Sequence, residues 1–276
     1  MFNFSIKNLL QHSTLEQEIL LAKAIKKDRV FVLTHPEYRL SLNQYWRFVY
    51  YLFLLHHGYS VAAIVQHKEF FGLEFFVNKH VLIPRPETEI IVVEAIKAID
   101  SSSEKILLID VGTGSGCILI AILKNSKKTI TTIALDISIS ALKVAKKNII
   151  RHSVNIELQK SNLLNKIKDR NFADFDKIII TANLPYLTTK QVAESPSIQK
   201  EPKIALAAKE NGLALYRQLF EQTKKIFPNK KNLILLEIDP SQNESIQKMA
   251  TKFFPEAKLE IKKDLSDLDR TLKIST

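Results

Sequence analysis

The sequence predicts an α/β fold in which a doubly wound, mostly parallel sheet follows a small all-helical domain. Three observations support this fold class. Residues 1–66 show helical periodicity, residues 105–254 alternate short apolar runs with helical patterns, and residues 258–274 indicate a final antiparallel hairpin. Repeated strand–helix units build a Rossmann-like sheet, and its ligands bind at the carboxyl ends of the strands.

Composition limits the class of protein. The 276 residues are 46% hydrophobic, include one cysteine and carry a formal net charge of +11. This composition is typical of a globular protein, and a single cysteine rules out an internal disulfide and argues against a cysteine-built metal site. The first residues lack a signal-peptide pattern, and the longest apolar stretch near them is too short to cross a bilayer. We therefore expect a cytoplasmic protein without a membrane partner.

The positive charge raises the question of a nucleic-acid partner. The lysines are scattered along predicted helices and chain ends, without a long basic block interleaved with aromatic residues. Such a distribution indicates solvated surface more than a nucleic-acid interface. We expect no direct nucleic-acid substrate, and nothing in the sequence requires more than a monomer.

The predicted N-terminal domain, residues 1–66, is helical. Polar and acidic residues at 13–18 can cap a first helix, and Ser41 can cap a second that ends at Gly58. The apolar faces of these helices can form a core of their own.

Residues 67–89 are predicted to be a β-hairpin linker. The runs 73–77 and 81–83 flank Asn78-Lys79-His80, which predicts a hairpin across that turn. Two prolines stiffen the exit, before a helix that runs to Ile99.

The predicted sheet domain is residues 90–276, in which glycines or polar residues stand at strand ends. The expected strands are 105–111, 129–135, 156–158, 177–181 and 233–238, followed by a hairpin of 258–262 with 270–274. The residues at or after their carboxyl ends are Asp110, Gly112 to Gly116, Asp136, Asn162 and Asn183. Because the carboxyl ends of parallel strands meet at one sheet edge, this convergence predicts the site.

A glycine cluster follows the first predicted strand of this domain. Gly112, Thr113, Gly114, Ser115 and Gly116 stand directly before a helical pattern. Glycine suits a backbone that turns tightly and lets a ligand approach, which favours a nucleotide-like ligand over a purely structural turn.

Asp136 closes the second strand of the domain, 20 residues after Gly116. A carboxylate at this place can accept both hydroxyls of a ribose, as NAD and S-adenosylmethionine both require. The structural alternative is an N-terminal cap for the following helix.

The tetrapeptide Asn183-Leu184-Pro185-Tyr186 distinguishes between these cofactors. The Asn183 side-chain oxygen and the Leu184 main-chain carbonyl can accept the two N–H bonds of an amide or exocyclic amine, and Tyr186 can pack on its face. Such a nitrogen is a weak nucleophile, so alignment with a sulfonium methyl group supplies most of the catalysis. The structural alternative is an ordinary turn at a strand end.

Over nearly its whole length the chain resembles the bacterial release-factor glutamine methyltransferases, the PrmC (HemK) family. The matching residues are Phe76-Val77 with Ile83 to Glu89, Asp110 to Gly116, Asp136, Asn183 to Tyr186, Glu201-Pro202 with Ala205-Leu206, Asn211 to Leu213 with Tyr216-Arg217, and Asp264-Leu265 with Asp269-Arg270.

The resemblance implies a class I S-adenosyl-L-methionine-dependent methyltransferase whose N-terminal domain helps to dock a peptide chain release factor. The substrate implied is the glutamine of the Gly-Gly-Gln (GGQ) loop of class 1 factors, methylated at its side-chain nitrogen N5. The residues implied to hold that glutamine are Asn183, Leu184, Pro185 and Tyr186. Those implied to hold S-adenosyl-L-methionine are Gly112, Thr113, Gly114, Ser115, Gly116, Asp136, Asn162, Leu163 and Asn183.

Some positions depart from the family pattern. Leu184 stands where proline is usual, but the cradle uses a main-chain carbonyl that leucine also supplies, so we expect activity to be kept. Asn162 replaces a usual aspartate, and Leu163 occupies a position that is often aromatic. Residues 58–66 lack the usual Gly-x-Pro-x-x-Tyr.

The sequence leaves three rival functions open. Asn-Leu-Pro-Tyr is also the motif of ribosomal RNA adenine dimethyltransferases, although those enzymes place the helical domain last and have no counterpart of residues 83–89. An NAD-dependent oxidoreductase is disfavoured by Cys117, which stands where a dinucleotide fingerprint has its third glycine. A binding module with a degenerate site is the non-enzymatic alternative.

For the favoured methyltransferase we expect the methyl group to move in one in-line displacement, without a metal or a covalent intermediate. We also expect residues 188–202 to form a lid that becomes ordered.

Overall fold

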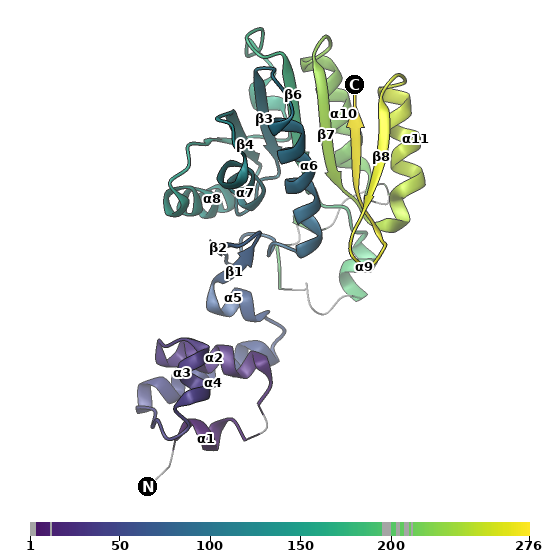
Figure 1. Cartoon of the computed structure of the whole chain (residues 1–276). Coiled ribbons are helices and arrows are strands. Elements are labelled where there is room, and N and C mark those ends of the chain that lie inside the picture. The colour runs from purple at the N-terminus through teal and green to yellow at the C-terminus, as the bar shows by residue number, and fades with distance from the viewer. Residues whose placement is uncertain (1–3, 12, 195–199, 203–204, 207–209, 211) are drawn as a thin grey trace.

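The computed structural model describes residues 4–11, 13–194, 200–202, 205–206, 210 and 212–276. Figure 1 shows a group of helices at the N-terminal end, a short hairpin next to it, and a large sheet flanked by helices. Within the described ranges, no helix combines the length and the apolar character that crossing a membrane requires.

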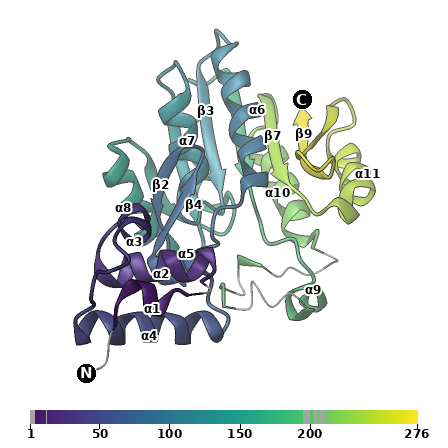
Figure 2. The same cartoon turned by 60° about the horizontal axis from the view of Figure 1, so that its bottom comes forward.

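The N-terminal helices share a hydrophobic core. They are α1 (Ile6–Leu9), α2 (Leu15–Ile25), α3 (Arg29–Thr34), α4 (Leu42–His56) and α5 (Val61–Val65). Thr14, within the predicted capping segment, caps α2, and Ser41 caps α4 as the sequence predicted; both make reciprocal capping boxes. Among the described residues, the buried side chains of this core lie between Ile6 and Ile64, and Phe4 and Val65 pack against them. Figure 2 shows α4 along the edge of this group that is remote from the sheet.

The hairpin that follows α5 differs from the predicted one. β1 (His67–Phe70) pairs antiparallel with β2 (Leu73–Phe76). Phe71 and Gly72 connect them with φ angles of 52° and 71°, as a two-residue type I′ turn requires. The predicted pairing of residues 73–77 with 81–83 is therefore wrong. Residues 81–83 form no strand, and Val81 is buried in the sheet domain instead.

The large sheet has the strand order β5-β4-β3-β6-β7-β9-β8. Its strands are β3 (Ile106–Val111), β4 (Thr131–Asp136), β5 (Glu157–Lys160), β6 (Lys177–Ala182), β7 (Lys231–Glu237), β8 (Lys258–Lys263) and β9 (Asp269–Ser275). β3 to β7 run parallel, and β9 pairs antiparallel with both β7 and β8. This arrangement confirms the predicted fold class. The strand order reverses between β3 and β6, which is where doubly wound folds bind their ligands.

Helices pack on both faces of the sheet. α6 (Glu89–Asp100), α7 (Cys117–Asn125) and α8 (Ile139–His152) share a core with one face, and α10 (Ala214–Ile226) and α11 (Asn243–Phe253) share a core with the other. Alternate residues of β3 supply the two cores: Leu107 and Ile109 point to α10 and α11, while Leu108 points to the opposite side. The short helix α9 (Thr189–Glu194) comes after β6.

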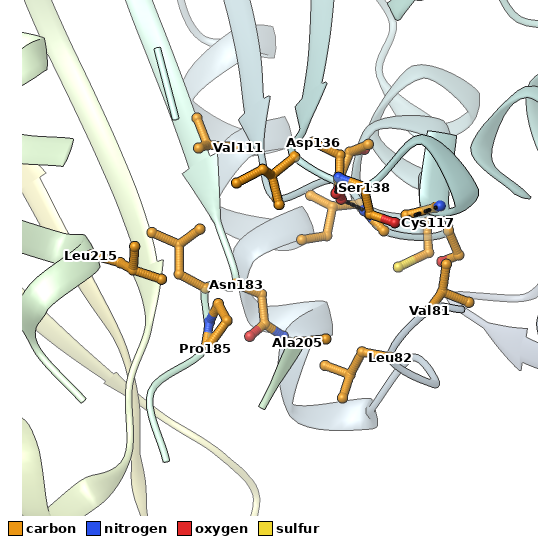
Figure 3. Close-up of a pocket in the computed structure, with 18 of the residues that line it drawn as sticks. Val81, Leu82, Val111, Cys117, Asp136, Ser138, Asn183, Pro185, Ala205 and Leu215 are labelled. Atoms are coloured by element: carbon orange, nitrogen blue, oxygen red, sulfur yellow. Dashed lines mark hydrogen bonds between the residues drawn. The ribbon is translucent and has the colours of Figure 1, made fainter. Parts of the chain in front are cut away.

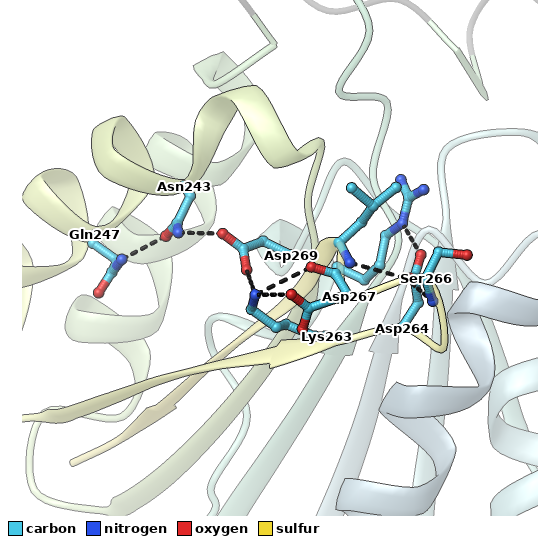
Figure 4. A network of polar contacts seen from close by, with 9 residues as sticks. Asn243, Gln247, Lys263, Asp264, Ser266, Asp267 and Asp269 are labelled. Carbon is cyan, nitrogen blue, oxygen red and sulfur yellow. Dashed lines mark hydrogen bonds and ion pairs between the residues drawn. The ribbon is translucent and has the colours of Figure 1, made fainter.

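The C-terminal hairpin of β8 and β9 was predicted, and polar contacts hold its turn (Figure 4). Asp264 Oδ1 accepts the main-chain N–H groups of Ser266 and Leu268 at 2.8 and 3.0 Å. Asp264 Oδ2 accepts from Arg270 Nε at 2.8 Å. Asn243 at the start of α11 donates to Asp269 at 2.5 Å, so the turn is joined to the helix beside it.

Candidate functional site

A pocket opens at the carboxyl ends of β3, β4 and β6, where the sequence predicts the site. Val111 at the end of β3, Asp136 at the end of β4 and Asn183 directly after β6 line it. Figure 3 shows Val81 and Leu82 across the pocket from Asn183. The pocket therefore lies between the sheet edge and the segment that precedes α6.

Most predicted site residues meet in this pocket. Those that line it are Gly112, Thr113, Gly114, Ser115, Asp136, Asn162, Leu163, Asn183, Leu184 and Pro185. Two predicted residues do not line it. A side chain at Gly116 would meet Ile120 and Ala145, so this glycine serves the packing of α7 on α8. Tyr186 turns its hydroxyl to the carboxylate of Glu237.

The glycine turn is held by the neighbouring strand. The main-chain N–H groups of Gly112 and Thr113 both donate to the Leu135 carbonyl, at 2.8 and 3.0 Å. Gly112 has a φ of 76°, and a Cβ atom on it would lie 3.0 Å from Leu184 Cδ2. Only glycine satisfies both the backbone conformation and this close approach.

Asp136 is buried and rigidly held. Its Oδ2 accepts the Gly114 N–H at 2.9 Å, and its Oδ1 accepts the Ser138 N–H at 2.8 Å. Burial raises the pKa of the carboxyl group, against the effect of these two N–H donors. Each oxygen can still accept a further hydrogen bond, because a carboxylate oxygen has two lone pairs.

The turn after β5 completes this side of the pocket. The Ser161 N–H donates to the Asp136 carbonyl at 2.9 Å, which ties the turn to the end of β4. Leu163 adopts a φ of 50°, an uncommon conformation for a residue with a branched side chain. Its side chain is buried in the core with α10. Strained backbone of this kind is often found at binding sites.

The Asn183 side chain is held by a carboxylate that sequence reasoning missed. Asn183 Nδ2 donates to Glu237 Oε2 at 2.8 Å and lies 3.2 Å from Thr88 Oγ1. The Thr88 hydroxyl itself donates to Glu237 Oε2 at 2.5 Å, and the Tyr186 hydroxyl donates to Glu237 Oε1 at 3.1 Å. Burial raises the pKa of Glu237, while the Thr88 and Tyr186 hydroxyls and the charge of Arg270 oppose that shift.

The Leu184 carbonyl keeps most of its capacity to accept hydrogen bonds. The buried Tyr216 hydroxyl is 3.5 Å from this oxygen, at the limit for a hydrogen bond, and only 2.5 Å from the Glu237 main-chain oxygen. The Leu184 side chain is 3% exposed and belongs to the core under the pocket.

The wall opposite Asn183 is anchored by a buried carboxylate. Glu201 accepts the Ile83 N–H at 3.2 Å and pairs with Arg85 at 2.5 Å. Burial raises the pKa of Glu201, while Arg85 opposes the shift. The two sequence motifs that contain these residues thus meet in space, although 116 residues separate Arg85 from Glu201.

Two further ionisable groups lie in or beneath the pocket. Burial raises the pKa of Cys117 to about 12, so the thiol in the pocket wall is neutral and a poor nucleophile at neutral pH. Burial also raises the pKa of Asp110 to about 6, against the hydroxyls of Thr113 and Thr181. The Thr181 hydroxyl donates to Asp110 at 2.7 Å.

Parts of two expected features fall outside the described residues. The expected lid at 188–202 includes residues 195–199, and the expected Asn211-Gly212-Leu213 match includes residue 211. Gly212 itself is described, and the main chain of Tyr186 occupies the space where its Cβ would stand.

Comparison with known proteins identifies relatives over almost the full length. Residues 90–199 match the family model described as methyltransferase small domain. The chain is 34% identical over 260 residues to a release factor glutamine methyltransferase of Mycoplasma mycoides, which covers 92% of this chain and 90% of that protein. A release factor glutamine methyltransferase of Clostridium acetobutylicum is 33% identical over 264 residues. The match covers 93% of this chain and 89% of that protein.

A solved structure supports the fold alone. A methyltransferase from Pyrococcus furiosus superposes with a TM-score of 0.52 at 18% sequence identity, covering 80% of this chain and 95% of that chain.

Proposed function

The chain belongs to the family of release factor glutamine methyltransferases, and we propose that it methylates N5 of the glutamine in the GGQ motif of class 1 peptide chain release factors. The observation that carries this proposal is one pocket in which Asn183 and the Leu184 main chain lie beside the glycine turn and Asp136. An acceptor for amide hydrogens and a candidate cofactor cradle thus share one cavity.

We propose S-adenosyl-L-methionine as the methyl donor. When bound, it supplies a methyl group on a positively charged sulfur. Its ribose fits the Asp136 carboxylate, whose oxygens are fixed by two main-chain N–H groups and can still accept from two hydroxyls. A Cβ atom at Gly114 would meet only the Gly112 carbonyl oxygen, at 3.9 Å, so the turn leaves room for a close ligand there. Thr113, Ser115, Asn162 and Leu163 complete the proposed cofactor wall.

The glutamine amide is proposed to bind through its two N–H bonds. Asn183 Oδ1 would accept one of them and the Leu184 carbonyl the other. Both acceptors become more favourable as positive charge develops on the nitrogen during transfer, which stabilises the transition state more than the bound substrate. Pro185 restricts the backbone of Leu184, so the carbonyl is oriented before the substrate arrives.

We propose that residues 1–66 form a release-factor docking domain, that 67–89 link it, and that 90–276 catalyse the reaction. The separate core of the N-terminal helices supports this division. Docking is supported by large apolar side chains exposed on α4, among them Leu42, Trp46 and Phe53. Because release factors act in translation termination, we place the enzyme in the cytoplasm. We also propose that it acts as a monomer.

The named relatives favour this protein substrate over ribosomal RNA, the alternative raised by Asn-Leu-Pro-Tyr. The test is methyl transfer from labelled S-adenosylmethionine to a purified class 1 release factor, to its Gly-Gly-Ala variant and to deproteinised ribosomal RNA. We expect label on the wild-type factor alone. Label on the RNA instead would overturn the proposal and assign the Asn183 cradle to an adenine amine.

A further inference from the structure

Glu237, the last residue of β7, binds the side chain that is proposed to hold the substrate. Its Oε2 accepts from Asn183 Nδ2 and Thr88 Oγ1, and its Oε1 accepts from the Tyr186 hydroxyl. We propose that Glu237 is a positioning residue that fixes the Asn183 amide with its nitrogen toward the protein and its oxygen toward the pocket. The identity of the substrate in this inference rests on the proposed function.

The hydrogen-bond inventory permits only one orientation of the Asn183 amide. Both carboxyl oxygens of Glu237 act as acceptors, Oε2 for the Thr88 hydroxyl and Oε1 for the Tyr186 hydroxyl, so the NH2 group of Asn183 faces Glu237. Thr88 has one hydroxyl hydrogen and donates it to Glu237, so Thr88 can only accept from Asn183. Both neighbours require the same orientation, and no described residue donates to Asn183 Oδ1. That oxygen is left to accept from the substrate.

The reversed amide would fail in two ways. Its oxygen would face the Glu237 and Thr88 oxygens, and its NH2 group would meet the N–H bonds of the substrate amide. Glu237 is 2% exposed, so bulk water is not available to replace a lost partner. The three hydroxyl and amide donors around this carboxylate thus form a buried network that specifies the polarity of the pocket wall.

An exchange of charge between the two residues tests this role. In Asn183→Asp, two carboxylates face each other, and we expect kcat to fall at least 100-fold. In Asn183→Asp with Glu237→Gln, the amide introduced at position 237 can donate to one oxygen of the carboxylate at position 183, while the other oxygen faces the pocket. We expect kcat at least tenfold above that of Asn183→Asp, with the KM for the release factor within twofold of the single variant. A double variant with a kcat no higher than that of Asn183→Asp would overturn the proposal. If Glu237 had a merely structural role, the effects of the two substitutions on kcat would add.

The matched control is Asn183→Asp with Glu94→Gln. Glu94 is also a buried carboxylate, at 6% exposure, but it pairs with Lys97 and Lys273, whereas Asn183 binds Thr88 and Glu237. We expect this pair to keep the low kcat of Asn183→Asp. If kcat recovered as much in this control as in Asn183→Asp with Glu237→Gln, Glu237 would not be the specific partner of residue 183.

A second measurement does not depend on the substrate. The side-chain NH2 signals of Asn183, assigned by their loss in Asn183→Ala, should exchange with solvent at least tenfold more slowly than those of the exposed Asn171. Equal exchange rates would overturn the positioning role even if release factor is methylated. Slow exchange in a protein that methylates no release factor would support the positioning role while the proposed function fails.

Discussion

Asp136 Oδ2 accepts the main-chain N–H of Gly114 at 2.9 Å, so the carboxylate that ends β4 holds the glycine turn that follows β3. Its second oxygen binds the Ser138 N–H at the start of α8. The structural and ligand-binding interpretations of Asp136 are therefore compatible. The hydrogen bonds that stabilise the turn also fix the direction in which the carboxylate can accept from a ligand.

The substitution Asp136→Ala is expected to raise the Kd for S-adenosylmethionine at least tenfold, because the proposed acceptor of the ribose hydroxyls is lost. The variant should also lose about 1–3 kcal/mol of unfolding free energy, since the partly buried N–H groups of Gly114 and Ser138 lose their acceptor. Calorimetric titration and denaturant unfolding measure the two effects. An unchanged Kd would remove Asp136 from the cofactor site.

Asp100→Ala is the matched control for this variant. Asp100 also accepts two hydrogen bonds, from the Ser126 hydroxyl at 2.7 Å and the Lys127 N–H at 3.1 Å, but it lies at the end of α6 and does not line the pocket. We expect a comparable loss of stability with no change in cofactor affinity.

The convergence of the glycine turn, Asp136 and Asn183 could be predicted from the sequence because each of them directly follows a strongly apolar run. A strand buried on both faces gives such a run, and parallel strands end at one edge of the sheet. The strand ends at Asp136 and Asn183 thus indicated neighbours in space without any alignment.

Glu237 could not be predicted in this way. Its partners Asn183, Tyr186 and Thr88 are 54, 51 and 149 residues away, and no local spacing relates them. Its position at the end of β7 was the only available signal.

The β1–β2 hairpin was misplaced for a different reason. Phe71 in its turn adopts a positive φ that its residue type disfavours, and the Phe71 N–H donates to Glu89 at 2.8 Å.

For Asn183→Ala we expect a loss of turnover of at least 100-fold, because the substrate amide loses an acceptor that becomes stronger in the transition state. The Kd for S-adenosylmethionine should stay within threefold, since Asp136 and the glycine turn are untouched. Single-turnover methylation and calorimetric titration make the comparison. Normal turnover in this variant would contradict the proposed function of the cradle.

The contact between Gly112 and Leu184 predicts a coupled pair. Gly112→Ala should lower the unfolding free energy by about 1–3 kcal/mol, because alanine disfavours a φ of 76° and its Cβ would lie 3.0 Å from Leu184 Cδ2. In the Leu184→Ala background the penalty should shrink by about 1 kcal/mol, since the contact is gone and only the backbone cost remains. A double-mutant cycle by denaturant unfolding measures this coupling. Strict additivity would mean that the side-chain contact carries no cost.

Asp110 gives the protein a pH-dependent stability that Asp110→Asn should remove. Burial raises the pKa of this group from 3.8 to about 6, so between these values the folded protein binds more protons than the unfolded chain. The contribution of Asp110 to the stability therefore falls as the pH rises through this window and is level above it, with a total effect of about 3 kcal/mol.

The test compares denaturant unfolding of wild type and Asp110→Asn at pH 5 and pH 8. Asparagine keeps an acceptor for the Thr181 hydroxyl, and any pH-independent cost of the substitution cancels between the two conditions. The stability of the variant relative to wild type should rise by about 1 kcal/mol from pH 5 to pH 8, because most of the remaining ionisation of Asp110 occurs in that interval. A difference that is constant with pH would show that Asp110 ionises in the folded protein as readily as in the unfolded chain, and its burial would then carry no electrostatic cost.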